Sequence, residues 1–77
     1  MKIEMFAIKD ELSAYAMPLP FESDETAIRY FKYQCQTGIM ADSPKDFSIW
    51  NIGTYETEKG LIEGHEPRLI IRAEAIK

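Results

Sequence analysis

Residues 47–62, FSIWNIGTYETEKGLI, constrain the fold most, because they read as a strand, a turn and a returning strand. Strand side chains alternate between two faces, and apolar residues occupy both faces in the first half. This pattern predicts a first half covered on both sides and a second half that is a solvent-exposed hairpin. Gly60 can adopt the positive φ that the turn needs. The alternation assigns one face to Phe47, Ile49, Asn51, Gly53 and Tyr55.

The chain has 77 residues, of which 45% are hydrophobic, including four Phe, four Tyr and one Trp. A chain of this length buries only roughly 60 to 65% of its unfolded surface. We therefore expect a single domain, residues 1–77, of marginal stability. Small folds often gain stability by association, so a homodimer is a reasonable expectation.

The charge balance is acidic, with 9 Lys and Arg against 13 Asp and Glu, a net charge of −4 and a pI near 4.9. Neutralising phosphates with basic residues drives much of nucleic-acid binding. The global charge therefore argues against tight, non-specific DNA binding, although it leaves room for a local basic face.

Cys35 is the single cysteine, which excludes an internal disulfide and a cysteine-rich zinc site. The first ten residues are charged and lack the apolar run of a signal peptide. No window approaches the roughly 20 apolar residues of a membrane span. We expect a soluble, reduced, cytoplasmic protein with no membrane partner.

Alternating side chains within residues 2–10 predict a strand of about seven residues. A turn follows, after which residues 14–17 are predicted to return as a short edge strand. Pro18 and Pro20 are expected to end that strand, because proline has no N–H to donate to a ladder.

Residues 24–36 form the one long predicted helix, capped by Ser23 and ended by Gly38. Acidic residues in the first turn suit the positive end of the helix. One helix face is apolar and is expected to point inward: Ala27, Ile28, Phe31 and Cys35.

The opposite face of that helix carries a basic stripe with an aromatic in it: Arg29, Lys32, Tyr33 and Gln36. Cations and an aromatic ring together suit a phosphate and a stacked base. An ordinary solvated helix face with a half-buried tyrosine is the competing interpretation.

Residues 39–46 form a connector in which Ser43 and Pro44 can open a helical turn. Residues 68–77 are predicted as a last strand, separate from the hairpin return. A short helix from Ile71 onward is the alternative, because alanine and glutamate favour helices.

Arg68 and Arg72 lie four apart, so on a strand they would share a face. Lys2 or Lys9 would join them if the first and last strands pair. With Tyr15 or Trp50 nearby, such a face would be a platform for single-stranded nucleic acid. Charged edge strands that discourage aggregation are the competing reading.

The predicted fold class is α+β, a small antiparallel sheet of three to five strands packed by one α-helix. The expected element order is strand, short strand, helix, strand, strand, strand. No internal repeat or linker is visible in the sequence.

Catalytic chemistry finds no support in the residues. His65 stands in a Gly-His-Glu-Pro stretch, where we expect a solvated loop histidine rather than a general base. Cys35 is expected to be a small buried hydrophobe. The acidic residues lack calcium-loop spacing and no glycine-rich phosphate loop occurs. We expect a protein that is not an enzyme and binds no metal or cofactor.

The ordered motifs of the chain resemble the small non-structural protein of gokushoviruses, microviruses with single-stranded DNA genomes. The resemblance rests on seven segments and covers most of the chain: Phe6-Ala7-Ile8-Lys9-Asp10, Ala14-Tyr15, Pro18-Leu19-Pro20-Phe21, Ala27-Ile28-Arg29-Tyr30-Phe31, Pro44-Lys45-Asp46-Phe47, Ile52-Gly53-Thr54-Tyr55 and Glu58-Lys59-Gly60. Residues 34–38 depart from the family's loop, and the tail from Arg68 onward does not match.

The resemblance implies a non-virion protein that binds single-stranded DNA during viral genome synthesis or packaging. The expected contacts are Arg29, Lys32 and Tyr33, with Arg68 and Arg72 as a second set. The rival hypothesis is a protein-interaction module that meets a phage or host protein through Tyr15, Trp50 or Tyr55.

Overall fold

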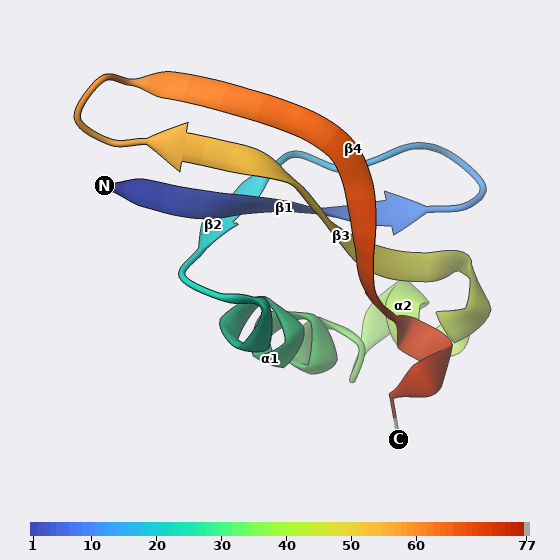
Figure 1. Ribbon diagram of the computed structural model, residues 1–77. Coiled ribbons are helices and arrows are strands. Elements are labelled where there is room, and N and C mark those ends of the chain that lie inside the picture. The colour runs from blue at the N-terminus through green and yellow to red at the C-terminus, as the bar shows by residue number, and fades with distance from the viewer. Residues whose placement is uncertain (77) are drawn as a thin grey trace.

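A four-stranded antiparallel sheet in the order β2-β1-β3-β4 organises the molecule (Figure 1). The computed structural model describes residues 1–76. The strands are β1 (Lys2–Asp10), β2 (Leu19–Phe21), β3 (Phe47–Glu56) and β4 (Leu61–Arg72). The helical segments are α1 (Asp24–Gln34), α2 (Gly38–Asp42) and the 3₁₀ turns η1 (Pro44–Asp46) and η2 (Ala73–Ala75). An α+β fold with a small antiparallel sheet is therefore confirmed.

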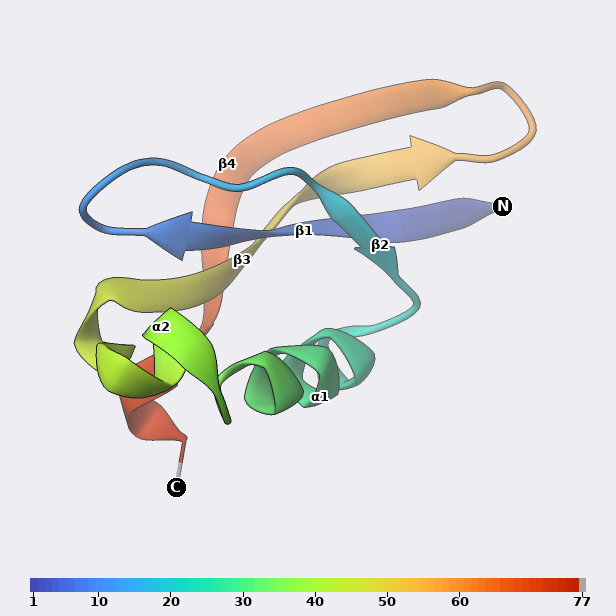
Figure 2. The ribbon, with the colours of Figure 1, turned by 180° about the vertical axis from the view of Figure 1, so that it is seen from behind.

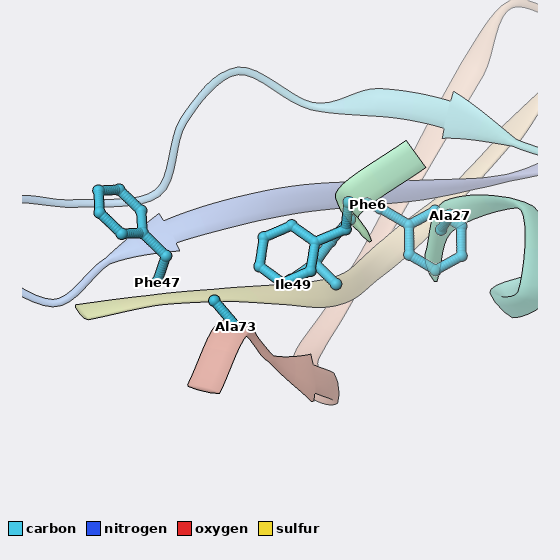
Figure 3. Close-up of a cluster of buried hydrophobic side chains, with 6 residues drawn as sticks. Phe6, Ala27, Phe47, Ile49 and Ala73 are labelled. Carbon is cyan, nitrogen blue, oxygen red and sulfur yellow. The ribbon is translucent and has the colours of Figure 1, made fainter. Parts of the chain in front are cut away.

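The core lies on one face of this sheet, which we call the covered face. Directly paired residues of neighbouring strands share a face, and the register places Ile8 opposite Ile49 and Asp10 opposite Phe47. The covered face therefore holds Phe6 and Ile8 of β1 together with Phe47 and Ile49 of β3. The buried cluster, most of which Figure 3 shows, comprises Phe6, Ala27, Phe31, Phe47, Ile49 and Ala73.

Helix α1 begins and packs as the sequence predicts. The Ser23 side chain accepts a hydrogen bond from the Thr26 backbone N–H, and Thr26 accepts one in return from the Ser23 N–H, which completes a capping box. Ala27 and Phe31 are fully buried, whereas Ile28 and Cys35 are half-buried. The inward face is confirmed.

The end of that helix differs from the prediction. Helix α1 ends at Gln34, and Gly38, at φ 73°, begins the separate short helix α2. Glycine fits there because positive φ strains other residues. The predicted helical turn at Pro44 is confirmed as η1, whereas α2 was not expected.

The predicted second strand over residues 14–17 is wrong. Tyr15 forms only an isolated bridge with Lys9, and the strand proper is β2, around Pro20. Proline is tolerated there because β2 lies at the sheet edge. Phe21 holds β2 in place, since its ring packs against Phe6 at 5.8 Å and Tyr30 at 5.1 Å between centroids.

The predicted separation of the hairpin return from the last strand is also wrong. Strand β4 runs without interruption through the Gly64–Pro67 stretch that suggested a break. Residues 65–67 form a bulge opposite Ile52, because Arg68 pairs with Asn51 whereas Gly64 pairs with Gly53. The short helix considered from Ile71 onward is present only as η2, and Lys77 lies outside the described residues.

A second irregularity falls at Ile52, where the register with β1 shifts. Phe6 lies opposite Asn51, whereas Met5 lies opposite Gly53, so the extra residue reverses the alternation. Tyr55 therefore shares a face with Trp50, and its predicted place beside Phe47 is wrong.

Burial divides the molecule into two regions along its length of 40 Å. The packed half comprises residues 6–10 and 47–51 with the helical segments, and it contains the buried cluster. The projecting hairpin comprises residues 52–69, of which Gly53 is the sole buried residue. Figures 1 and 2 show its tip far from the helices. The predicted contrast in burial is confirmed, since Phe47, Ser48 and Ile49 are buried and residues 54–56 are half-buried. The predicted cover on both sides of the first half is not found, because the helices pack on one face of the sheet.

Candidate nucleic-acid interface

The face of the sheet opposite the core cluster, which we call the open face, is defined by the strand register. Four rows of paired residues cross it from β1 through β3 to β4. Residues in a row share a face because they are directly opposite one another. The rows are Ile3, Tyr55 and Ile62; Met5, Gly53 and Gly64; Ala7, Trp50 and Leu69; and Lys9, Ser48 and Arg72.

A cluster of one cation and two aromatic rings occupies one end of the open face. The Lys9 ammonium lies 5.4 Å from the Tyr15 ring centroid and 5.6 Å from that of Trp50. The two rings meet edge to face at 6.2 Å. This geometry suits cation–π attraction and leaves ring surface exposed, since Tyr15 is 41% exposed.

Local hydrogen bonding fixes the indole of Trp50. Its Nε1–H donates to the Ser48 Oγ at 2.8 Å, two residues back on the same face. Ser48 is fully buried beneath it, and no buried side-chain polar atom within residues 1–76 lacks a partner. This bond satisfies the indole N–H, so the Trp50 ring is half-buried without an unpaired donor.

The predicted helix stripe lies on α1, away from the open face. Arg29, Lys32 and Tyr33 are all exposed, and Tyr33 is 69% exposed rather than half-buried. Helix α1 contributes to the core on the covered face. The stripe therefore remains a prediction, on a surface separate from the open-face cluster.

Arg68 and Arg72 do not share a face as predicted. Arg68 lies opposite Asn51 and Arg72 opposite Ser48, positions three apart on β3 that point to opposite sides. The cause is a bulge at Ile70, which the register skips. Arg72 therefore joins the open face, whereas Arg68 reaches the Asp24 carboxylate on α1, with N–O distances of 3.3 and 3.4 Å.

The first and last strands do not pair, because β3 lies between β1 and β4, so the condition under which Lys2 or Lys9 would join the two arginines is not met. Lys2 is on the covered side and reaches Glu63 at 3.6 Å. Lys9 nevertheless meets Tyr15 and Trp50, as the platform prediction requires, and it also lies 3.7 Å from Glu11.

Three polar side chains, Glu4, Asn51 and His65, form a hydrogen-bonded network on the covered side at the base of the projecting hairpin. We call this network the polar relay; the sequence did not predict it. The Asn51 amide donates to the Glu4 carboxylate at 2.7 Å, and its oxygen lies 2.9 Å from His65 Nε2. His65 Nδ1 lies 2.7 Å from the Glu66 carbonyl. His65 is exposed, as expected, but it lies in β4 rather than in a loop, and both its ring nitrogens have hydrogen-bond partners. An asparagine within an apolar strand was the available signal, since buried polar groups need partners.

Cys35 borders a cavity of about 350 Å³ between α1, α2 and η2. Burial raises the pKa of its thiol, which disfavours the reactive thiolate. No group of three His, Cys, Asp or Glu side chains placed to hold a metal occurs within residues 1–76. In the same range no helix is both long and apolar enough to cross a membrane.

The fold and its open face define a small α+β protein with an aromatic sheet surface uncovered by its helices. A family profile described as Phage ORF5 protein matches residues 3–76. The chain therefore belongs to the phage ORF5 protein family. No curated protein and no solved structure matches it significantly.

Proposed function

We propose that this phage protein is a non-enzymatic accessory factor that binds single-stranded DNA on its open face. In this proposal it acts in the host cytoplasm during genome synthesis or packaging of a gokushovirus-type phage. Membership of the phage ORF5 family supports the phage setting, and the chain's resemblance to the gokushovirus non-structural protein supports the DNA ligand.

One observation carries the choice of surface. Among the residues of β1, β3 and β4 that the paired register assigns to the open face, only Lys9 and Arg72 are charged. The paired strand residues of this face therefore carry two cations and no acid, although the Glu11 carboxylate lies 3.7 Å from the Lys9 ammonium and offsets part of that charge. The global charge argues against non-specific binding over the whole surface, but it leaves this face suited to a polyanion.

The arrangement matches the chemistry of single-strand recognition. Exposed bases stack on aromatic rings, and each stacked base contributes about 1–3 kcal/mol. Tyr15 and Trp50 offer such rings, and Lys9 and Arg72 flank Ser48 in the adjoining row, where they can meet backbone phosphates. The ligand class follows from this alternation of ring and cation.

Trp50 is the chain's single tryptophan, so its fluorescence reports directly on the open face. We expect oligothymidine to quench it at low salt. With two phosphate contacts, the plot of log affinity against log salt should have a slope of about −1.4. Absence of quenching and of binding at low salt would overturn the proposal.

Substitutions separate the two candidate surfaces. Tyr15→Ala is expected to weaken binding by about five- to 150-fold, the loss of one stacked base. Lys9→Gln is expected to weaken binding and to reduce the salt slope by about 0.7, the loss of one phosphate contact. Tyr33→Ala is the matched aromatic control. If Arg29→Glu with Lys32→Glu abolishes binding while Tyr15→Ala leaves it unchanged, the helix stripe is the site instead.

A protein-interaction role is the second candidate, and one observation favours it. Tyr15, Trp50 and Tyr55 all belong to the open face, together with the exposed apolar residues Ile62 and Leu69. Recovery of phage or host protein from infected cells that resists nuclease treatment would favour this role. Recovery that nuclease abolishes would favour DNA.

A further inference from the structure

The outer edge of β4 is unpaired within residues 1–76, because β4 ends the strand order and has β3 as its one neighbour. At 12 residues it is the longest strand of the sheet. The two arms of β4, residues 61–63 and 68–70, carry exposed apolar side chains: Leu61, Ile62 and Leu69. A long edge of this kind is a template for pairing with another strand.

The sequence of β4 is complementary to itself when read in the opposite direction. An antiparallel register that places Glu63 opposite Arg68 of a second copy also places Ile62 opposite Leu69 and Leu61 opposite Ile70. The same register pairs Gly64 with Pro67. Opposite charges and apolar pairs facing one another across strands are favourable, and each pair occurs twice because of the two-fold symmetry.

The structure satisfies a second condition that this register imposes. Residues directly opposite one another must point to the same face. Ile62 and Leu69 both lie on the open face, since they pair with Tyr55 and Trp50. Glu63 and Arg68 both lie on the covered side, opposite Thr54 and Asn51. In a regular strand, residues an odd number apart would point to opposite faces, so the agreement depends on the bulge at 65–67.

The bulge also explains why the edge would be selective. A bulge and a proline within an edge strand discourage pairing with arbitrary strands. Here both fall near the centre of the register, where His65 would meet Glu66 and Pro67 would meet Gly64. The two arms on either side, residues 61–63 and 68–70, provide the pairing. A strand without the same central irregularity would not match both arms.

We propose that the β4 edge binds a second copy of this chain, in antiparallel register with Glu63 opposite Arg68. The two sheets then form one continuous sheet. Antiparallel pairing of identical edges places the two-fold axis perpendicular to the sheet, so both open faces lie on the same side. The proposal concerns the edge and does not depend on what the open face binds.

Sedimentation equilibrium of the full chain without DNA tests the association. We expect a concentration-dependent dimer that Ile62→Lys weakens by at least about tenfold, because a buried isoleucine is replaced by a charge. Ile39→Lys on α2 is the matched control, since Ile39 is 66% exposed and Ile62 69%. A chain that stays monomeric at all concentrations would overturn the proposal.

Charge reversal tests the register. Glu63→Arg and Arg68→Glu should each weaken the dimer by about tenfold, because like charges then face one another twice, and the double variant should recover most of the loss. Asp24→Asn removes the intramolecular partner of Arg68 and should leave dimerisation unchanged. A dimer insensitive to these reversals would show that another surface is used.

Disulfide crosslinking tests the same register by the formation of a covalent dimer. In a Cys35→Ala background, Ile62→Cys with Leu69→Cys should give a disulfide-linked dimer on mild oxidation, because opposite residues bring their Cβ atoms within disulfide reach. Either cysteine alone should not crosslink. Equal crosslinking by the single variants would contradict the register.

Discussion

The packed half and the projecting hairpin share two strands yet are stabilised differently. In the packed half, the rings of Phe6 and Phe31 are fully buried between the sheet and α1. In the projecting hairpin, where Gly53 is the sole buried residue, stability must come from the ladders, cross-strand pairs and surface ion pairs such as Arg68 with Asp24 of α1. A hairpin without a packing layer is marginal in water. The packed half therefore has to hold the base of the hairpin.

The largest expected effect tests the packed half. Phe31→Ala should lower the free energy of unfolding by about 3–5 kcal/mol, because it removes a fully buried ring and leaves a cavity. Tyr33→Ala, two residues along the same helix but exposed, should change it by less than about 0.5 kcal/mol. Urea denaturation measures both, and similar losses would contradict a core on one side of α1.

The next effect lies where the two regions join. A Cβ added at Gly53 would collide with the Glu63 backbone carbonyl on β4, so the strands would have to separate. Gly53→Ala should cost about 2 kcal/mol. Gly64→Ala on the facing strand is the matched control, since its Cβ would have no heavy atom closer than 3.8 Å. Equal costs would show that β3 and β4 do not approach closely here.

The polar relay offers a smaller effect at the same junction. Asn51 is 1% exposed and is the single side chain that joins Glu4 to His65. Asn51→Leu should cost about 1 kcal/mol, since its partners are less buried and water can replace part of what they lose. Amide hydrogen exchange should accelerate more in the projecting hairpin than in α1. Uniform acceleration would show that the relay does not anchor the hairpin.

The same division explains what the sequence could predict. Local signals identified the Ser23 cap, the inward face of α1, the 47–62 hairpin and the burial contrast along β3, because each depends on neighbouring residues. The bulges at Ile52, 65–67 and Ile70 exist only in the pairing of distant strands. They placed Tyr55 and Arg72 on the open face and separated Arg68 from Arg72, so the candidate site was only half predictable.

The edge strand β2 shows the same limit. Pro20 suggests an end to a strand when it is read locally. Its place at the sheet edge and the aromatic contacts of Phe21 depend on tertiary structure. Propensity was overridden there because a three-residue edge strand needs few ladder hydrogen bonds.

The smallest effect concerns the tip of the projecting hairpin, where the Met1 ammonium donates to Glu56 at 2.7 Å and Glu58 at 3.2 Å. The hydrogen bond from this ammonium lowers the pKa of Glu56 from its ordinary 4.5, and its bonds to Glu56 and Glu58 raise the pKa of the ammonium from 8.0. Because the pKa of the Glu56 carboxyl is lowered on folding, its contribution to stability is present above the pKa of the unfolded state and is lost as pH falls through the pKa of the folded state. Because the pKa of the Met1 ammonium is raised on folding, its contribution to stability is present below the pKa of the unfolded state and is lost as pH rises through the pKa of the folded state.

The tip should therefore be most stable between about pH 4.5 and 8.0 and loosen on either side. The change should be slight, because the pair is exposed and solvent screens it. The amide of Thr57, which donates to the Met1 carbonyl at 2.9 Å, is a local NMR reporter of this contact. Its shift should follow both titrations, and Glu56→Gln should remove the acidic limb. An unchanged titration in Glu56→Gln would mean that the ammonium does not hold the tip, and that the hairpin relies on its base alone.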